Sequence, residues 1–179
     1  MIKFYKYQGT GNDFIMIDNR NQYFPKNDVE LVKKMCDRRF GIGADGLILL
    51  ENHENLDFQM VYYNSDGNES TMCGNGGRCI VAFVHFLNVF ENKAKFNAID
   101  GLHEAEINGN VVKLKMIDVP EIAKIDTDYQ LNTCSPHFVR YVEDVQNLDV
   151  YKNGYEIRNS EPYKKEGINV NFVSKISDN

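Results

Sequence analysis

The sequence lacks an excess of positive charge, a long apolar run and an export signal. Its formal net charge is −6, which argues against nucleic acid as a partner because phosphate binding needs a basic face. No apolar run reaches the ~18 residues that span a bilayer. The opening residues, MIKFYKYQGTGNDF, contain no apolar core of a signal peptide. We therefore expect a soluble, cytoplasmic protein with no membrane partner.

The cysteines also lack the spacing of a metal site. Cys73 and Cys79 are six positions apart, whereas zinc ligands in such motifs are separated by two to four residues, and no histidine completes the pattern. In a chain without an export signal we expect reduced thiols. We predict no metal and no disulfide for these two cysteines or for Cys36 and Cys134.

Alternating apolar residues and turn signals predict a mixed α/β chain. Strands are predicted at 2–8, 13–18, 45–50, 58–63, 94–99, 102–107 and 111–117. Hairpin turns are predicted at 9–12 and 108–110, where glycine and asparagine cluster. A helix is predicted over 28–39, with Asn27 as its N-cap and Glu30 at the capping-box position.

The least polar stretch, GRCIVAFVHFLNVF at 77–90, predicts a buried helix. It is too long for one strand, since strands average ~5–6 residues. A helix that is apolar on nearly every face must be buried on nearly every face. We therefore expect a central helix wrapped by a curved sheet. Within it, His85 is interpreted as a core histidine bonded to the backbone rather than as a catalytic group.

Two pairs of segments indicate an internal repeat. GTGNDFIMID at 9–18 resembles TCSPHFVRYV at 133–142, and GIGADGLILL at 41–50 resembles GINVNFVSKI at 167–176. The order and spacing agree, which favours two related domains with the second beginning near residue 118. Chance similarity between strand patterns is the alternative.

The glycine-rich segment around Cys73 carries the strongest chemical signal. Gly74, Gly76 and Gly77 leave uncovered the backbone N–H groups that have no partner at a helix start. These donors and the positive end of the helix form a small anion site, where a cysteine has its thiolate favoured. If the α-carboxylate of an amino acid bound there, its α-carbon would face the Cys73 thiol. The backbone donors would then stabilise the negative charge that removal of the α-proton creates. This predicts α-proton chemistry without pyridoxal phosphate.

Two other interpretations of this segment remain open at this point. Such a helix start can be simple tight packing, or it can hold a nucleotide phosphate. The P-loop pattern is absent because no Lys-Ser or Lys-Thr follows, and the glycines read G-x-G-G rather than G-x-G-x-x-G. The residues alone favour a catalytic and a structural Cys73 equally. Cys79 inside the apolar helix is interpreted as a core residue, and Cys36 as structural.

Five segments follow one another along the chain: GTGNDFI at 9–15, RRFGIGADGLI at 38–48, the Asp-Gly-x-Glu and Cys-Gly-Asn-Gly-x-Arg run at 66–78, SPHFV at 135–139 and GINVNFV at 167–173. In this order they resemble segments of the diaminopimelate epimerase family. The resemblance covers nearly the whole chain. It extends to a wider fold group with proline racemases and phenazine-biosynthesis isomerases.

The resemblance implies an α/β fold in which a curved mixed or antiparallel sheet wraps a central helix. It implies a first domain at 1–117 carrying Cys73 and an incomplete second copy at 118–179. The implied activity is a cofactor-independent isomerase that interconverts LL- and meso-2,6-diaminopimelate, in lysine and cell-wall precursor biosynthesis. Its partner would be this small molecule, and a homodimer is left open.

The resemblance also implies roles for single residues. Cys73 matches one of two cysteines that move the α-proton. Substrate-binding positions are matched by Asn12, Asn64, Gly74, Asn75, Ser135, His137 and Asn169. Four positions depart from the family: Cys134 replaces a glycine, Ser135 an asparagine, Asn68 a common serine, and Gly46 stands where some members have glutamine.

The second cysteine, in a Cys-Gly-Thr-Gly segment, and the Glu-Arg pair before it are absent from this sequence. The repeat predicts the partner of Cys73 near position 199. We therefore expect that this chain alone does not epimerise, although it can bind a carboxylate. The alternatives are another racemase or isomerase of the fold group, or a non-catalytic carboxylate-binding module.

Overall fold

A computed structural model describes residues 2–176. Residue 1 and residues 177–179, which the predicted domains include, lie outside the described part. The contacts divide the chain into two compact units, Met1–Met116 and Ile117–Asn179. No helix in the described part is long and apolar enough to cross a membrane.

The first unit contains one seven-stranded sheet in which the strands follow their sequence order. The strands are β1 Tyr5–Gly9, β2 Asn12–Asp18, β3 Gly46–Glu51, β4 Phe58–Asn64, β5 Lys93–Ala98, β6 Gly101–Asn108 and β7 Val111–Lys115. Strands β2 and β3 are parallel, as are β4 and β5, and the other neighbours are antiparallel. Each parallel connection contains a helix, as such crossovers commonly do.

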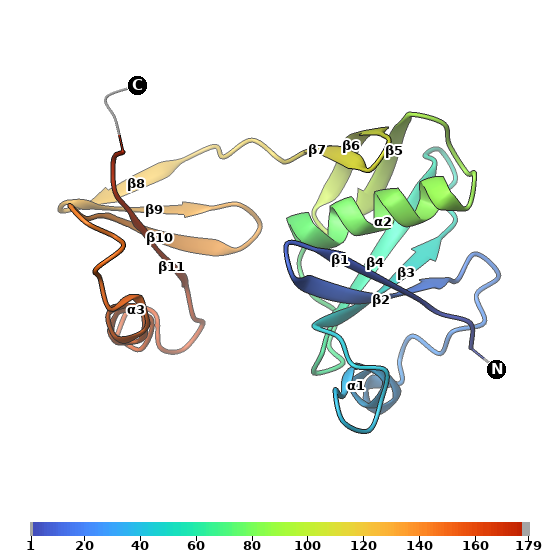
Figure 1. Cartoon of the computed structure of the whole chain (residues 1–179), viewed down its shortest axis with the longest axis horizontal. Helices are drawn as coiled ribbons and strands as arrows, with labels where there is room; N and C mark the ends of the chain where they lie inside the picture. The colour runs from blue at the N-terminus through green and yellow to red at the C-terminus, as the bar shows by residue number, and fades with distance from the viewer. Residues whose placement is uncertain (1, 177–179) are drawn as a thin grey trace. The chain divides into compact units, whose positions relative to one another are not determined.

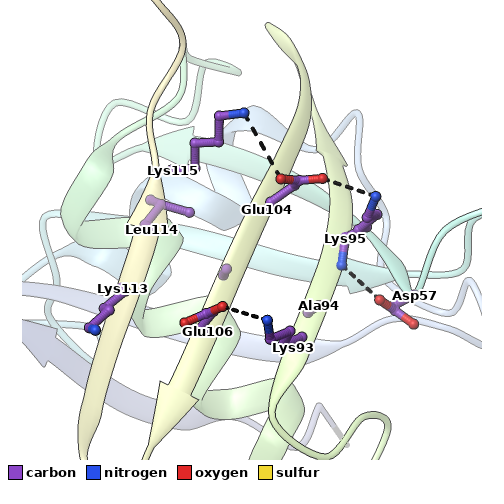
Figure 2. Close-up of a pocket in the computed structure, with 10 residues that line it drawn as sticks. Asp57, Lys93, Ala94, Lys95, Glu104, Glu106, Lys113, Leu114 and Lys115 are labelled. Carbon is purple, nitrogen blue, oxygen red and sulfur yellow. Dashed lines mark hydrogen bonds and ion pairs between the residues drawn. The ribbon is translucent and has the colours of Figure 1, made fainter.

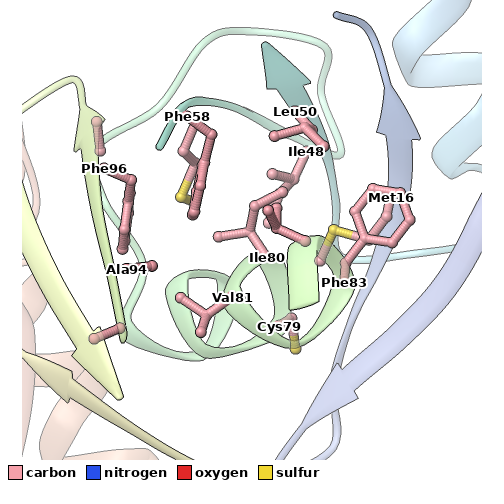
Figure 3. Packing of buried hydrophobic residues seen from close by; sticks show 14 of the residues in the cluster. Met16, Ile48, Leu50, Phe58, Cys79, Ile80, Val81, Phe83, Ala94 and Phe96 are labelled. Carbon is pink, nitrogen blue, oxygen red and sulfur yellow. The ribbon is translucent and has the colours of Figure 1, made fainter. Parts of the chain in front are cut away.

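Helix α2, Gly74–Phe86, lies against the sheet and contacts both edge strands, β1 and β7 (Figure 1). A sheet whose two edges reach one helix must curve around it, so the predicted architecture is confirmed. Figure 3 shows Ile80 and Phe83 of the helix packed among sheet residues such as Met16 and Phe58. All four side chains are fully buried or nearly so, and burying each contributes roughly 1.5–3 kcal/mol.

Helix α1, Val29–Cys36, covers the opposite face of β2 and β3. Val32 and Met35 of this helix pack with Ile15, Ile17 and Leu47 of the two strands. Both strands are therefore buried on both faces. This burial explains their nearly continuous apolar sequences, because a strand covered on both faces has no polar alternation.

The boundaries of both predicted helices need correction. The N-cap of α1 is Asp28 rather than Asn27: its carboxylate accepts a hydrogen bond from the Leu31 N–H at 2.9 Å. Helix α1 ends at Cys36, three residues early. Helix α2 begins at Gly74, three residues before the apolar run. It ends before Asn88, whose φ of 56° is left-handed and cannot continue a helix.

The interpretation of His85 as a core histidine bonded to the backbone is wrong. Its side chain is half-buried and lies near the ring of Phe90, with ring centroids 5.8 Å apart. The neighbouring Phe86 is 58% exposed. The C-terminal turn of α2 therefore leaves the core that surrounds its middle.

The second unit has a four-stranded sheet, β8 Ile122–Ile125, β9 Asp128–Asn132, β10 Pro136–Tyr141 and β11 Asn169–Val173, with helix α3 Val150–Arg158 between the last two. An antiparallel hairpin, a helix and a parallel strand thus follow one another as in β1–β2–α1–β3. Phe14 pairs with Gly46 and Phe138 with Val170 at the same separation along the chain.

This register corrects one alignment of the repeat. Gly167 corresponds to Gly43 and not to Gly41. The φ angles of Gly43 and Gly167 are 80° and 79°, a left-handed conformation that glycine adopts without strain. The sequence alignment slipped by two residues because both glycines of GIG fit the pattern.

Candidate active site

Cys73 is the N-cap residue of α2, with an extended backbone and a half-buried side chain. The helix starts without a side-chain cap, and its first internal bond runs from the Gly77 N–H to the Cys73 carbonyl at 2.7 Å. The first N–H groups of a helix have no partner within the helix. The thiol therefore lies at the end of α2 that presents backbone donors.

The glycines after Cys73 differ in why they are needed. A Cβ on Gly77 would lie 2.3 Å from Met72 Cε and 2.7 Å from Leu114 Cδ2, so the side chains packed around Gly77 would have to shift to admit it. A Cβ on Gly74 would meet nothing closer than 3.7 Å. Tight packing therefore explains Gly77 but not Gly74, beside the thiol.

The turn between β1 and β2 brings Asn12 to Cys73. Thr10 and Gly11 have φ angles of 54° and 86° and form the two-residue loop of the hairpin, as the strand twist favours. Asn12 starts β2, and its Oδ1 accepts a hydrogen bond from the Cys73 thiol, with the sulfur 3.5 Å away. A predicted substrate residue and the predicted acid/base are thus in contact.

Asn75 joins the same cluster from the first turn of α2. Its Nδ2 lies 3.5 Å from Asn12 Oδ1. Its Oδ1 accepts from the Thr10 hydroxyl at 3.2 Å and from the guanidinium of Arg78. Asn12, Cys73 and Asn75, three of the predicted site residues, therefore form one hydrogen-bonded group.

A cluster of charged residues supports this group: Asp13 lies on β2, Arg38 follows α1 and Asp45 lies just before β3. Asn12 Nδ2 donates to Asp45 Oδ2 at 2.7 Å, and Arg38 donates to both Asp45 and Asp13 at 2.7 Å. The hydrogen bond from Asn12 is the main cause that lowers the pKa of Asp45. The bond from Arg38 holds the pKa of Asp13 well below its usual range, with Lys6 as a further partner. Both carboxylates are therefore ionised and accept hydrogen bonds only.

Asn64, another predicted substrate residue, is oriented by two hydroxyl groups. Tyr62 donates to its Oδ1 at 2.9 Å, and its Nδ2 donates to Ser70 Oγ at 2.9 Å. Burial raises the pKa of Tyr62 to about 12, so the phenol remains a donor. A Cβ on Gly46 would lie 2.5 Å from Tyr62 Cε2 and 2.6 Å from the Tyr63 carbonyl. The ring of Tyr62 thus occupies the space beside Gly46.

The other cysteines have different environments. Burial raises the pKa values of Cys36 and Cys79 to about 11, so both remain thiols at neutral pH. Their side chains lie in the two apolar clusters of the first unit. Cys134 has a φ of 75°, in the region that favours the family's glycine at this position.

The second unit holds the remaining predicted residues, Ser135, His137 and Asn169. His137 on β10 and Asn169 on β11 are paired neighbours in the parallel register. His137 Nδ1 lies 3.1 Å from Nδ2 of Asn171, which also donates to the Asn169 carbonyl at 3.2 Å. Ser135 lies just before β10, where its carbonyl accepts the Thr133 N–H at 3.1 Å.

A separate hollow lies on the outer face of β5, β6 and β7, as Figure 2 shows. Glu104 lies 2.9 Å from Lys95 and 4.0 Å from Lys115, and Glu106 lies 2.8 Å from Lys93. These lysines lower the pKa values of both glutamates. The described lining contains no predicted site residue, and the cross-strand pairs support strand register.

Residues 2–176 contain no group of three or more His, Cys, Asp or Glu side chains arranged to hold a metal ion.

Comparison with known proteins identifies the family. The diaminopimelate epimerase family model matches residues 4–119. Diaminopimelate epimerase from Flavobacterium psychrophilum is 59% identical over 177 residues, which cover 98% of this chain and 69% of the relative. This chain belongs to the diaminopimelate epimerase family. The relative from Aquifex aeolicus is 39% identical over 99% of this chain and 70% of its own length. The family is one of isomerases.

Solved structures share the fold. A phenazine biosynthesis protein of the PhzF family from Bacillus anthracis aligns with a TM-score of 0.66 at 13% identity, over 99% of this chain and 68% of its own. A hydroxyproline epimerase from Agrobacterium vitis aligns with a TM-score of 0.52 at 12% identity, over 79% of this chain and 50% of its own. The diaminopimelate epimerase family thus shares its architecture with the wider fold group predicted from the sequence.

The sequence reasoning missed the side chains that support the predicted residues: Thr10, Asp13, Arg38, Asp45, Tyr62, Ser70 and Arg78. Thr10 and Asp45 bond to residues 65 and 33 positions away, contacts that no local pattern predicts. The one available signal was Arg78, the fifth residue of α2. A cation near the N-terminal end of a helix is unfavourable with the helix dipole, which indicates a local partner.

Proposed function

We propose that this chain provides one half of the acid/base machinery that interconverts LL- and meso-2,6-diaminopimelate. Membership of the diaminopimelate epimerase family supports the reaction class. The observation that carries the proposal is the position of Cys73, at the donor end of α2 and in contact with Asn12. Through this reaction the chain would serve lysine and cell-wall precursor biosynthesis.

In the proposed mechanism Cys73 exchanges one proton with the α-carbon. As the thiolate, it takes the α-hydrogen as a proton, and the electron pair of the C–H bond moves into the α-carboxylate. The N–H groups of Gly74 and Asn75 would hold that carboxylate where its charge increases. Removing one such donor commonly costs about 10²–10³ in rate. A second acid/base group returns a proton to the opposite face, since one fixed group serves one face.

The remaining site residues would bind the polar ends of the substrate. Asn12, Asn64 and Asn75 present amides in the first unit, and Ser135, His137 and Asn169 are proposed as contacts from the second. The negative charge is stabilised by backbone donors, so the mechanism uses neither pyridoxal phosphate nor a metal. Exchange of the α-proton should accordingly survive dialysis against a chelator.

The decisive test is incubation with LL-diaminopimelate in deuterated water, followed by mass spectrometry of the amino acid. We expect deuterium at one α-carbon, and we expect the substrate to slow alkylation of Cys73 by iodoacetamide. L-Proline and trans-4-hydroxy-L-proline are controls for other activities of the fold group and should give neither effect. The proposal would be contradicted if diaminopimelate gave no deuterium exchange and no protection of Cys73. Exchange of proline alone would reassign the substrate.

A further inference from the structure

The amides of Asn12 and Asn75 lie in series between a cation and an anion. Arg78 donates to Asn75 Oδ1, Asn75 Nδ2 lies 3.5 Å from Asn12 Oδ1, and Asn12 Nδ2 donates to Asp45 at 2.7 Å. Every bond in this chain points from the guanidinium toward the carboxylate. The Cys73 thiol joins it at Asn12 Oδ1.

The charges at the two ends determine which way both amides face. A guanidinium can only donate and an ionised carboxylate can only accept. Asp45 must therefore meet the NH₂ group of Asn12, which leaves the amide oxygen for the sulfur of Cys73. The guanidinium of Arg78 likewise donates to the oxygen of Asn75 and directs its NH₂ group to Asn12.

We propose that Asp45 is a positioning residue that fixes the amide of Asn12 so that its oxygen faces the sulfur of Cys73, with Arg78 as the opposing anchor. The oxygen of Asn12 accepts a hydrogen bond from the S–H group of Cys73 and would repel a thiolate at the same place. A reversed amide would instead present an N–H group to the sulfur and favour the thiolate. Asp45 thus sets which atom of Asn12 the sulfur of Cys73 meets, and with it the reactivity of that sulfur, although Asp45 itself bonds to Asn12 and not to Cys73.

Asp45 also pairs with Arg38 at 2.7 Å, so simple loss of charge must be separated from loss of orientation. Asp13 provides the matched control. It belongs to the same cluster, pairs with Arg38 at 2.7 Å and, as the variant Asp13→Asn, loses the same charge. Its side chain bonds to Lys6, to Arg38 and to the backbone N–H of Asp45 at 3.2 Å, and not to the amide of Asn12.

The experiment measures the rate at which iodoacetamide alkylates Cys73, located by peptide mapping, at pH 7.5 in 1 M sodium chloride. At that ionic strength the Debye length is about 3 Å, so through-space effects of the lost charge are largely screened. We expect Asp45→Asn to accelerate alkylation about threefold or more. Without the carboxylate, the amide of Asn12 is free to turn and present its NH₂ group to the sulfur. Asp13→Asn should stay within about 1.5-fold of the original protein, with thermal unfolding as the check that both variants fold.

A double-mutant cycle with Asn12→Ala completes the test. If Asp45 acts through Asn12, Asp45→Asn should change the alkylation rate no further when residue 12 is alanine. Equal acceleration by Asp13→Asn, no acceleration by Asp45→Asn, or an undiminished effect in the Asn12→Ala background would each overturn the proposal. The inference rests on the proposed function only for its catalytic meaning, since alkylation needs no diaminopimelate and can fail independently of epimerase activity.

Discussion

Cys73 and Cys79 show how position gives one residue type two different environments. They lie on the same helix, one at its N-cap and the other within its apolar body. Burial raises the pKa of the Cys79 thiol to about 11, whereas Cys73 is half-buried and contacts a polar amide. The sequence predicted this difference from position, because Cys73 lies at the glycine-rich start of the predicted helix and Cys79 inside the apolar run. It could not predict the contact with Asn12, which depends on how a hairpin packs against the helix.

The charged cluster beside Asn12 should make stability depend on acid pH. The folded-state pKa of Asp13 is held down mainly by Arg38, so its contribution is present above the unfolded-state pKa of about 3.9 and is lost as the pH falls through the folded value. Urea unfolding between pH 5 and pH 2 should show a loss that is smaller in Asp13→Asn, by about 1 kcal/mol for a partly exposed ion pair. Parallel pH profiles for the two proteins would contradict this prediction.

At the scale of elements, the sequence predicted best where one local pattern determines the outcome. The buried strands β2 and β3 and the hairpin at Gly109 follow from apolar runs and turn residues. Helix α3 was missed because it buries none of its residues and so has little apolar patterning. The sequence places the start of α2 too late because Gly74, Gly76 and Gly77 are poor helix formers.

Two glycines should respond to alanine in opposite directions. A Cβ at Gly46 would press on the ring of Tyr62 and on a backbone carbonyl, so Gly46→Ala should lower the free energy of unfolding by about 1–3 kcal/mol. Gly154 lies inside α3 with its nearest neighbour, Phe172 Cε2, at 4.0 Å. Gly154→Ala should therefore raise the free energy of unfolding by about 0.5–1 kcal/mol. Denaturant titrations measure both, and a neutral Gly46→Ala would show that Tyr62 does not need this space.

On the scale of the whole molecule, the two units differ in how much core they contain. Two apolar clusters support the first unit. Only Asp128, Phe138 and Ile168 are buried among the described residues of the second. Asp128 is held by a bidentate pair with Arg140, at 2.8 and 2.9 Å. The sequence indicated a repeat, but a repeated pattern of strands does not reveal how much apolar surface each copy buries.

Hydrogen exchange should report this difference directly. Amides in β2 and β3 lie in strands covered on both faces and should exchange most slowly, whereas those in β8, whose four side chains are all exposed, should exchange faster. Mass spectrometry of peptides across the chain measures the order. Equal protection of β8 and β3 would mean that the two units unfold together as one cooperative structure.

The most direct test of a catalytic Cys73 compares two cysteine-to-alanine variants in the deuterium exchange assay with LL-diaminopimelate. Cys73→Ala should reduce α-proton exchange by about 10² or more, as expected when an acid/base group is removed. Cys79→Ala should retain exchange and lose on the order of 1 kcal/mol of stability, because it removes a small buried group. Equal loss of exchange in both variants, with both folded, would contradict the assignment of Cys73 as the group that moves the proton.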